Sequence, residues 1–143
     1  MLKETITYTD FNGVERTEDF YFNLSETELL NKQAGTEGGF DEKIKRIIAS
    51  NSVPEIFGLL NEIIIMSYGE KSLDGKSFKK KDANGRPLGE SFIETAAYDR
   101  MYMKFMQNPE EEIARFVNGI IPADLAKKVA EQQKNGITPF PAK

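Results

Sequence analysis

Apolar residues alternate with polar ones over the first 23 residues, and this alternation predicts a β-hairpin with a turn at Asn12-Gly13. A two-residue loop would place the apolar side chains of the two strands on opposite faces. A three-residue loop, Phe11-Asn12-Gly13, pairs even-numbered residues with even-numbered ones and leaves Gly13 left-handed in a bulge. We therefore predict the three-residue loop, which gathers five apolar side chains on one face: Leu2, Ile6, Tyr8, Phe20 and Phe22.

A helix start follows the hairpin directly. Ser25 is the expected N-cap, and Glu28 stands three residues later, which completes the pattern of a capping box. Leu24 and Leu29 are placed as the accompanying hydrophobic staple. The helix should be short, because Gly35 interrupts it soon afterwards.

Two longer helices are predicted next. Phe40 to about Ser50 carries apolar residues on one stripe. Ser52-Val53-Pro54 begins another helix that runs to about Tyr68, with Gly69 as its C-cap signal. The apolar residues of this helix point in nearly every direction around its axis, so we expect it to be the central core helix.

Residues 70–90 are polar and rich in turn signals, which indicates a long loop or a small irregular hairpin. The basic run Lys79-Lys80-Lys81 lies within them, either as part of a solvated loop or as a phosphate contact. Three further helices are predicted, over about Ser91 to Gln107, from Pro109 (with Asn108 as N-cap) to about Gly119, and over about Pro122 to Gln133.

The expected fold class is α+β and mostly α, with an N-terminal β-hairpin (residues 2–23) followed by a bundle of five to six helices (residues 25–133). We expect residues 1–133 to form a single globular domain, since 143 residues suffice for one hydrophobic core without metal or disulfide support. Residues 134–143 contain Gly136, Pro139 and Pro141, which predicts an extended or flexible C-terminal tail.

The chain has 19 basic and 23 acidic residues, a net charge of −4, and 39% hydrophobic residues, which is ordinary for a soluble protein. Its acidic balance argues against a nucleic-acid partner, because phosphates favour clustered Lys and Arg. The longest apolar run, Ile63 to Met66, is far shorter than the ~20 residues of a membrane span. No apolar segment of a signal peptide follows the charged N-terminal residues. We therefore expect a cytoplasmic protein with no membrane partner.

The chain contains no His and no Cys, which excludes the usual catalytic triads, cysteine nucleophiles and zinc sites. The densest acidic cluster, Glu110-Glu111-Glu112, lies in the predicted first turn of a helix, where the helix dipole accounts for it. Lys71-Ser72 lacks the first glycine of a P-loop, and the stretch from Asp82 to Gly85 lacks the ligand spacing of a calcium loop. We expect no catalytic, cofactor or metal site, and a binding protein rather than an enzyme.

The helix predicted over Ser91 to Gln107 is apolar on two faces. Phe92, Ala96, Met103 and Met106 lie on one side, whereas Tyr98, Met101 and Phe105 lie nearly opposite, with Tyr102 between the two sets. Either the helix is packed on both sides within its own domain, or one face contacts another chain. Tyr and Met are common at such contacts because they are large and adaptable.

Three stretches carry a resemblance to a known family: YTDFNGVERTEDFYFNL (residues 8–24), YGEKSLDG (68–75) and FVNGIIPADLA (116–126). In this order they resemble small tail assembly chaperone-like proteins from the tail-gene clusters of long-tailed phages of Gram-positive bacteria. The resemblance covers about residues 4–130. It implies a factor in the host cytoplasm that binds the tape-measure protein and assists polymerisation of the tail-tube protein, with homo-oligomerisation possible.

On this hypothesis the tape-measure protein, which is long and helical, docks helix against helix on an apolar stripe. The candidate contact residues are Tyr98, Met101, Tyr102 and Phe105, together with Ile137 and Phe140 of the tail. Two alternatives remain open: a structural virion component such as a minor tail or head-joining protein, and a small anti-defence effector.

Overall fold

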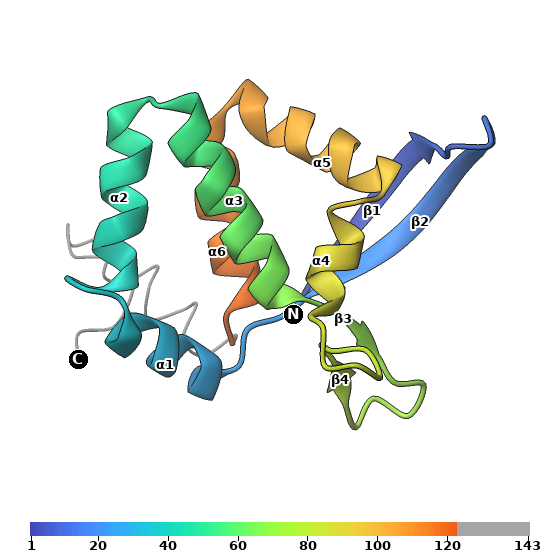
Figure 1. The fold of residues 1–143 in the computed structure, drawn as a ribbon, viewed down its shortest axis with the longest axis horizontal. Coiled ribbons are helices and arrows are strands. Elements are labelled where there is room, and N and C mark those ends of the chain that lie inside the picture. Colours follow the sequence, from blue (N-terminus) through green and yellow to red (C-terminus); the bar gives the residue numbers. More distant parts are fainter. Residues whose placement is uncertain (123–143) are drawn as a thin grey trace.

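The computed structural model describes residues 1–122. Within them, the chain forms a four-stranded antiparallel sheet in the order β1-β2-β3-β4 and six helices (Figure 1). The predicted fold class, α+β and mostly α with an N-terminal β-hairpin, is confirmed. Most of the helix predicted over Pro122 to Gln133, and the whole predicted tail, lie outside the described residues.

The N-terminal hairpin consists of β1 (Leu2–Thr9) and β2 (Glu15–Phe22), and Figure 1 shows it extending away from the helices at one end. Leu2 pairs with Phe22, and every pair that follows joins even with even or odd with odd. The Asp10 N–H donates to the Val14 carbonyl at 2.8 Å, and Gly13 has a φ of +81°. The predicted three-residue loop is therefore confirmed, and the even-numbered face of the hairpin packs on the core.

Residues 68–92 form a second, smaller hairpin and a short helix. β3 (Tyr68–Lys71) pairs with β2 and with β4 (Phe78–Lys79), so the hairpin alternative for the polar stretch is the correct one. The prediction of Gly69 as a C-cap is wrong, because Gly69 lies in β3 opposite Tyr21. A Cβ on Gly69 would lie 2.6 Å from the Lys79 carbonyl oxygen, so close strand packing requires the glycine.

The first three helices agree closely with the pattern of apolar residues. They are α1 (Glu26–Gly35), α2 (Phe40–Ser50) and α3 (Val53–Ser67). The capping box of α1 is present, since the Ser25 hydroxyl accepts from the Glu28 N–H and the Glu28 carboxylate accepts from the Ser25 N–H. Its staple residues, Leu24 and Leu29, are both buried. α3 runs through the middle of the molecule, as predicted (Figure 1).

The prediction of one continuous helix from Ser91 to Gln107 is wrong. The structure has a short helix, α4 (Leu88–Phe92), and then α5 (Ala96–Gln107). The Thr95 hydroxyl accepts from the Tyr98 N–H at 3.3 Å and donates to the Phe92 carbonyl at 2.7 Å. Thr95 therefore acts as the N-cap of a new helix rather than as an interior residue. The next helix, α6 (Pro109–Ile120), begins at the predicted proline.

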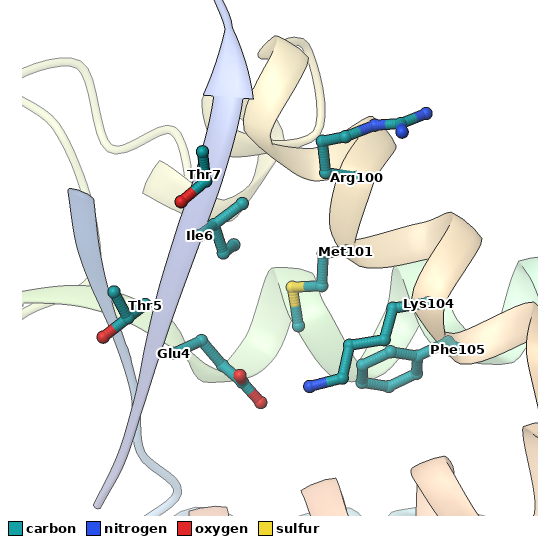
Figure 2. A pocket seen from close by; sticks show the side chains of 8 residues that line it. All are labelled: Glu4, Thr5, Ile6, Thr7, Arg100, Met101, Lys104 and Phe105. Atoms are coloured by element: carbon teal, nitrogen blue, oxygen red, sulfur yellow. The ribbon is translucent and has the colours of Figure 1, made fainter. Parts of the chain in front are cut away.

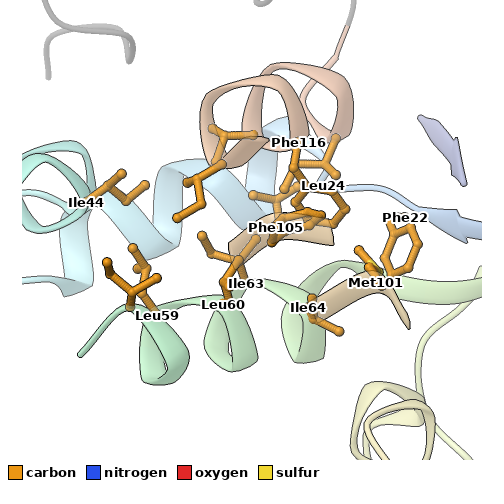
Figure 3. Close-up of a cluster of buried hydrophobic side chains, with 14 of the residues drawn as sticks. Phe22, Leu24, Ile44, Leu59, Leu60, Ile63, Ile64, Met101, Phe105 and Phe116 are labelled. Atoms are coloured by element: carbon orange, nitrogen blue, oxygen red, sulfur yellow. The ribbon is translucent and has the colours of Figure 1, made fainter. Parts of the chain in front are cut away.

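The core gathers around α3, between the hairpin and the other helices (Figure 3). Phe22 of β2, Phe105 of α5 and Phe116 of α6 are fully buried and contact one another edge to face in two pairs. Glu4 is a buried carboxylate on the inner face of β1, and it accepts a hydrogen bond from the Arg115 guanidinium at 2.8 Å. That ion pair ties the start of the hairpin to α6.

Candidate partner-binding surface

The structure separates the four candidate contact residues of α5 into two pairs. Met101 and Phe105 are 3% and 1% exposed, so they are core residues of this chain. Tyr98 and Tyr102 are half-buried and reach the surface. Ile137 and Phe140 lie outside the described residues.

Tyr98 and Tyr102 lie along the seam between α3 and α5. The Tyr98 hydroxyl donates to Asn61 Oδ1, and the Tyr102 ring contacts the Phe57 ring with a centroid separation of 5.1 Å. Tyr98 and Tyr102 are one turn apart on α5, and their partners Asn61 and Phe57 are one turn apart on α3 in the opposite direction.

Burial makes the Tyr98 hydroxyl a weaker acid than an ordinary tyrosine. It raises the pKa of the Tyr98 hydroxyl to about 12, with smaller contributions from the negative charges of Tyr102 and Asp99. The hydroxyl therefore stays protonated and available as a donor to Asn61 throughout the physiological range.

Two strongly exposed apolar side chains flank this seam. Val53, at the start of α3, is 56% exposed, and Met103 of α5 is 49% exposed. We define the α3–α5 surface by six apolar or aromatic residues on two adjoining helices: Val53, Phe57, Tyr98, Tyr102, Met103 and Met106.

The sequence pattern had placed Met103 and Met106 on the side opposite to the candidate residues. The two apolar faces of the predicted helix left open whether both are packed within the domain or one contacts another chain. The structure buries the side with Met101 and Phe105 and leaves Met103 open to solvent. Val53 and Phe57 were attributed to the core helix, and no signal in the sequence distinguishes their outward positions.

The basic run has a structural role at its middle residue. Lys80 Nζ donates to the main-chain carbonyls of Asn23 and Met66 at 2.6 and 2.9 Å, and it forms an ion pair with Glu28. Lys79 and Lys81 are exposed. Both interpretations of the run, a solvated loop and a phosphate contact, are therefore wrong for Lys80, because its ammonium group is bound by oxygens of the protein itself.

The described part of the chain has hollows on its surface. One, of about 190 Å³, lies between β1 and α5 (Figure 2). Another, of about 420 Å³, lies between α2 and α3, and its lining includes Lys43, Ile47 and Glu62. Residues 1–122 contain no group of three or more acidic, His or Cys side chains placed to hold a metal ion. No helix in the same range is long and apolar enough to cross a membrane.

Comparison with known protein families finds a match over nearly the whole chain. A family model described as phage tail assembly chaperone matches residues 1–141, which include all of the described residues and the whole α3–α5 surface. No curated protein matches the chain, and no solved structure matches it. The family match covers the three stretches that carried the resemblance in the sequence.

Proposed function

This chain belongs to the phage tail assembly chaperone family, which is non-enzymatic, and we propose that it binds the tape-measure protein in the host cytoplasm through the α3–α5 surface. The family match over nearly the whole chain carries the proposal. The chaperone keeps its client soluble and available while tail-tube subunits polymerise around it.

The form of the α3–α5 surface supports a helical client. Side chains of α3 and α5 contact each other at two places, Tyr98 with Asn61 and Tyr102 with Phe57. A helix of the client can lie over these contacts with its residues at i, i+3, i+4 and i+7 against them. Met103 and Met106 add flexible side chains that adapt to different client residues. The aromatic rings of Phe57 and Tyr102 supply rigid contact area beside them.

The test is co-expression of this chain with the tape-measure protein. The wild-type chaperone is expected to give a soluble complex that survives size-exclusion chromatography. Val53→Glu combined with Met103→Glu places two charges on the α3–α5 surface, and both positions are about half exposed, so the fold is retained. The double variant is expected to leave the client insoluble or unbound.

A matched control is available on α1. Leu30 is 64% exposed and apolar, and it lies on a different helix. Leu30→Glu is expected to leave the complex intact, which separates a local effect from the general effect of added charge. Equal binding by the wild type and the double variant would show that the client docks elsewhere. Mass spectrometry of purified particles tests the chaperone assignment itself, because a structural virion component would be found in them.

A further inference from the structure

A hollow lies at the free edge of the sheet, beside β1. The hollow between β1 and α5 is lined by four consecutive strand residues, from Glu4 to Thr7, and by four residues of α5. Successive strand side chains point to opposite faces, so a hollow that touches all four lies along the edge of β1. No residue of β2 lines the hollow, because β2 pairs with β1 along the opposite side of that strand.

The register gives the direction of the main-chain groups of β1. Asp10 bonds to Val14, so the even-numbered residues of β1 exchange hydrogen bonds with β2. The N–H and C=O groups of Thr5 and Thr7 therefore point outward, into the hollow. Among the described residues, no hydrogen bond to these outward groups is found. An eight-residue edge strand with open donors and acceptors is a template for another strand.

The α5 side of the hollow contributes a positive charge, that of Lys104. Figure 2 shows the Lys104 side chain directed toward β1, with Phe105 and Met101 near it on the same helix. Lys104 has no ion pair with any described residue, whereas Glu4, the only acid in the lining, is bound by Arg115. The open charge of the hollow is therefore positive.

We propose that this edge of β1 binds an extended, acidic segment of a partner polypeptide, which adds to the sheet as a further strand beside α5. The partner residues opposite Thr5 and Thr7 make the hydrogen bonds through their main chain, and their side chains lie on the exposed face. The side chains of the alternate partner residues point toward α5 and Lys104. The chain's own residues 123–143 carry four lysines and two acids, so charge disfavours them as the occupant. This site is separate from the α3–α5 surface and does not depend on the proposed client.

The test uses a synthetic peptide rather than a tail protein, so its outcome is independent of the proposed function. The probe is a labelled Thr-Glu-Thr-Val-Thr-Glu-Thr peptide, whose Glu and Val residues would face α5. One control replaces both Glu with Lys, and a second carries N-methyl groups on the Thr residues, which removes the bonding N–H groups. Fluorescence anisotropy is expected to show binding of the acidic peptide about tenfold tighter than binding of either control. The amide resonances of Thr5 and Thr7 are expected to shift most in a nuclear magnetic resonance titration.

Two protein variants complete the test. Lys104→Glu is expected to reverse the preference in favour of the Lys peptide, whereas Lys76→Glu, on the β3–β4 loop, should not change it. Thr7→Pro removes an outward N–H that the β1–β2 ladder does not use, so the fold is retained and binding is lost; Thr7→Val keeps binding. If Thr7→Pro fails to fold, Lys104→Glu and the N-methylated peptide decide. Equal affinity for all three peptides, no binding of the acidic peptide, or shifts away from β1 would overturn the proposal.

Discussion

The ammonium group of Lys80 lies 2.9 Å from both carboxylate oxygens of Glu28, which precedes it by 52 residues. Glu28 is also the N3 residue of the capping box of α1, where it accepts the Ser25 N–H at 3.0 Å. One carboxylate therefore closes the start of a helix and anchors the segment that follows β4. Lys80 also donates hydrogen bonds to the main-chain carbonyls of Asn23 and Met66. Its side chain therefore joins α1, the end of α3 and the second hairpin.

Lys80→Met is expected to lower the free energy of unfolding by about 2 kcal/mol, because it removes charged hydrogen bonds and leaves two carbonyls without their donor. Urea denaturation followed by circular dichroism measures the change. Lys79→Met is the matched control, since Lys79 is the exposed neighbour in the same basic run. An equal effect of the two substitutions would mean that net charge, and not the Lys80 contacts, determines the loss.

Acid should destabilise the protein partly through Glu62. Burial raises the pKa of the Glu62 carboxyl, but hydrogen bonds from Lys32 and Lys43 outweigh this and hold the pKa below its ordinary value of 4.5. Because the folded-state pKa is the lower one, the contribution to stability is complete above about pH 4.5 and is lost as the pH falls through the folded-state value.

The melting temperature of the wild type is therefore expected to fall below pH 4.5 more steeply than that of Glu62→Gln, in which this linkage is absent. Glu37→Gln serves as the control, because Glu37 is exposed in the turn after α1 and has no ion pair among the described residues. Parallel curves for the wild type and Glu62→Gln would contradict the assignment.

Local signals explain which features of the fold could be predicted. The register of the hairpin could be predicted from the alternation of apolar and polar residues and from Gly13. The helix α2 could be predicted from its apolar stripe and the polar residues that flank it. In both cases the signals lie within a few positions of each other in the sequence. The break at Thr95 was missed because the apolar residues continue across it at helical spacing. Lys80 was missed for a different reason: its partners at Asn23 and Met66 are distant in the sequence.

The candidate surface shows the same limit. Periodicity identified α5 as apolar on two faces, but the burial of Met101 and Phe105 depends on where β1 and α6 lie against the helix. The outward position of Val53 likewise depends on the packing of α3 and not on its own sequence. The sequence of one helix shows which of its faces are apolar, but the packing of other elements against the helix determines which of these faces is buried.

Two glycines should respond in opposite ways to alanine. A Cβ on Gly89 of α4 would lie 2.5 Å from Ile65 Cα, which is main chain of α3 and cannot give way. Gly89→Ala is expected to destabilise the fold by about 1–3 kcal/mol. Gly58, inside α3, has nothing within 4 Å of the same position, so Gly58→Ala is expected to stabilise by about 0.5–1 kcal/mol through helix propensity. Urea denaturation of both variants checks the contrast, and stabilisation by Gly89→Ala would contradict the close packing of α4 on α3.

The seam of the α3–α5 surface can be followed through the ionisation of Tyr98. Burial raises its pKa to about 12 from the ordinary 10.0, so the neutral hydroxyl is favoured in the folded state. The corresponding stability is complete below about pH 10 and is lost as the pH rises through about 12. Tyr98→Phe removes the hydrogen bond to Asn61 and is expected to cost about 1 kcal/mol at neutral pH.

In a near-ultraviolet absorbance titration of phenolate, the difference between the wild type and Tyr98→Phe should have its midpoint near pH 12. Tyr102→Phe is the matched control, because the ring contact with Phe57 persists and no hydrogen bond of the Tyr102 hydroxyl is found among the described residues. It is expected to leave stability at neutral pH unchanged. A difference midpoint near pH 10 for Tyr98 would mean that its hydroxyl is exposed, and that the seam between α3 and α5 is open in solution.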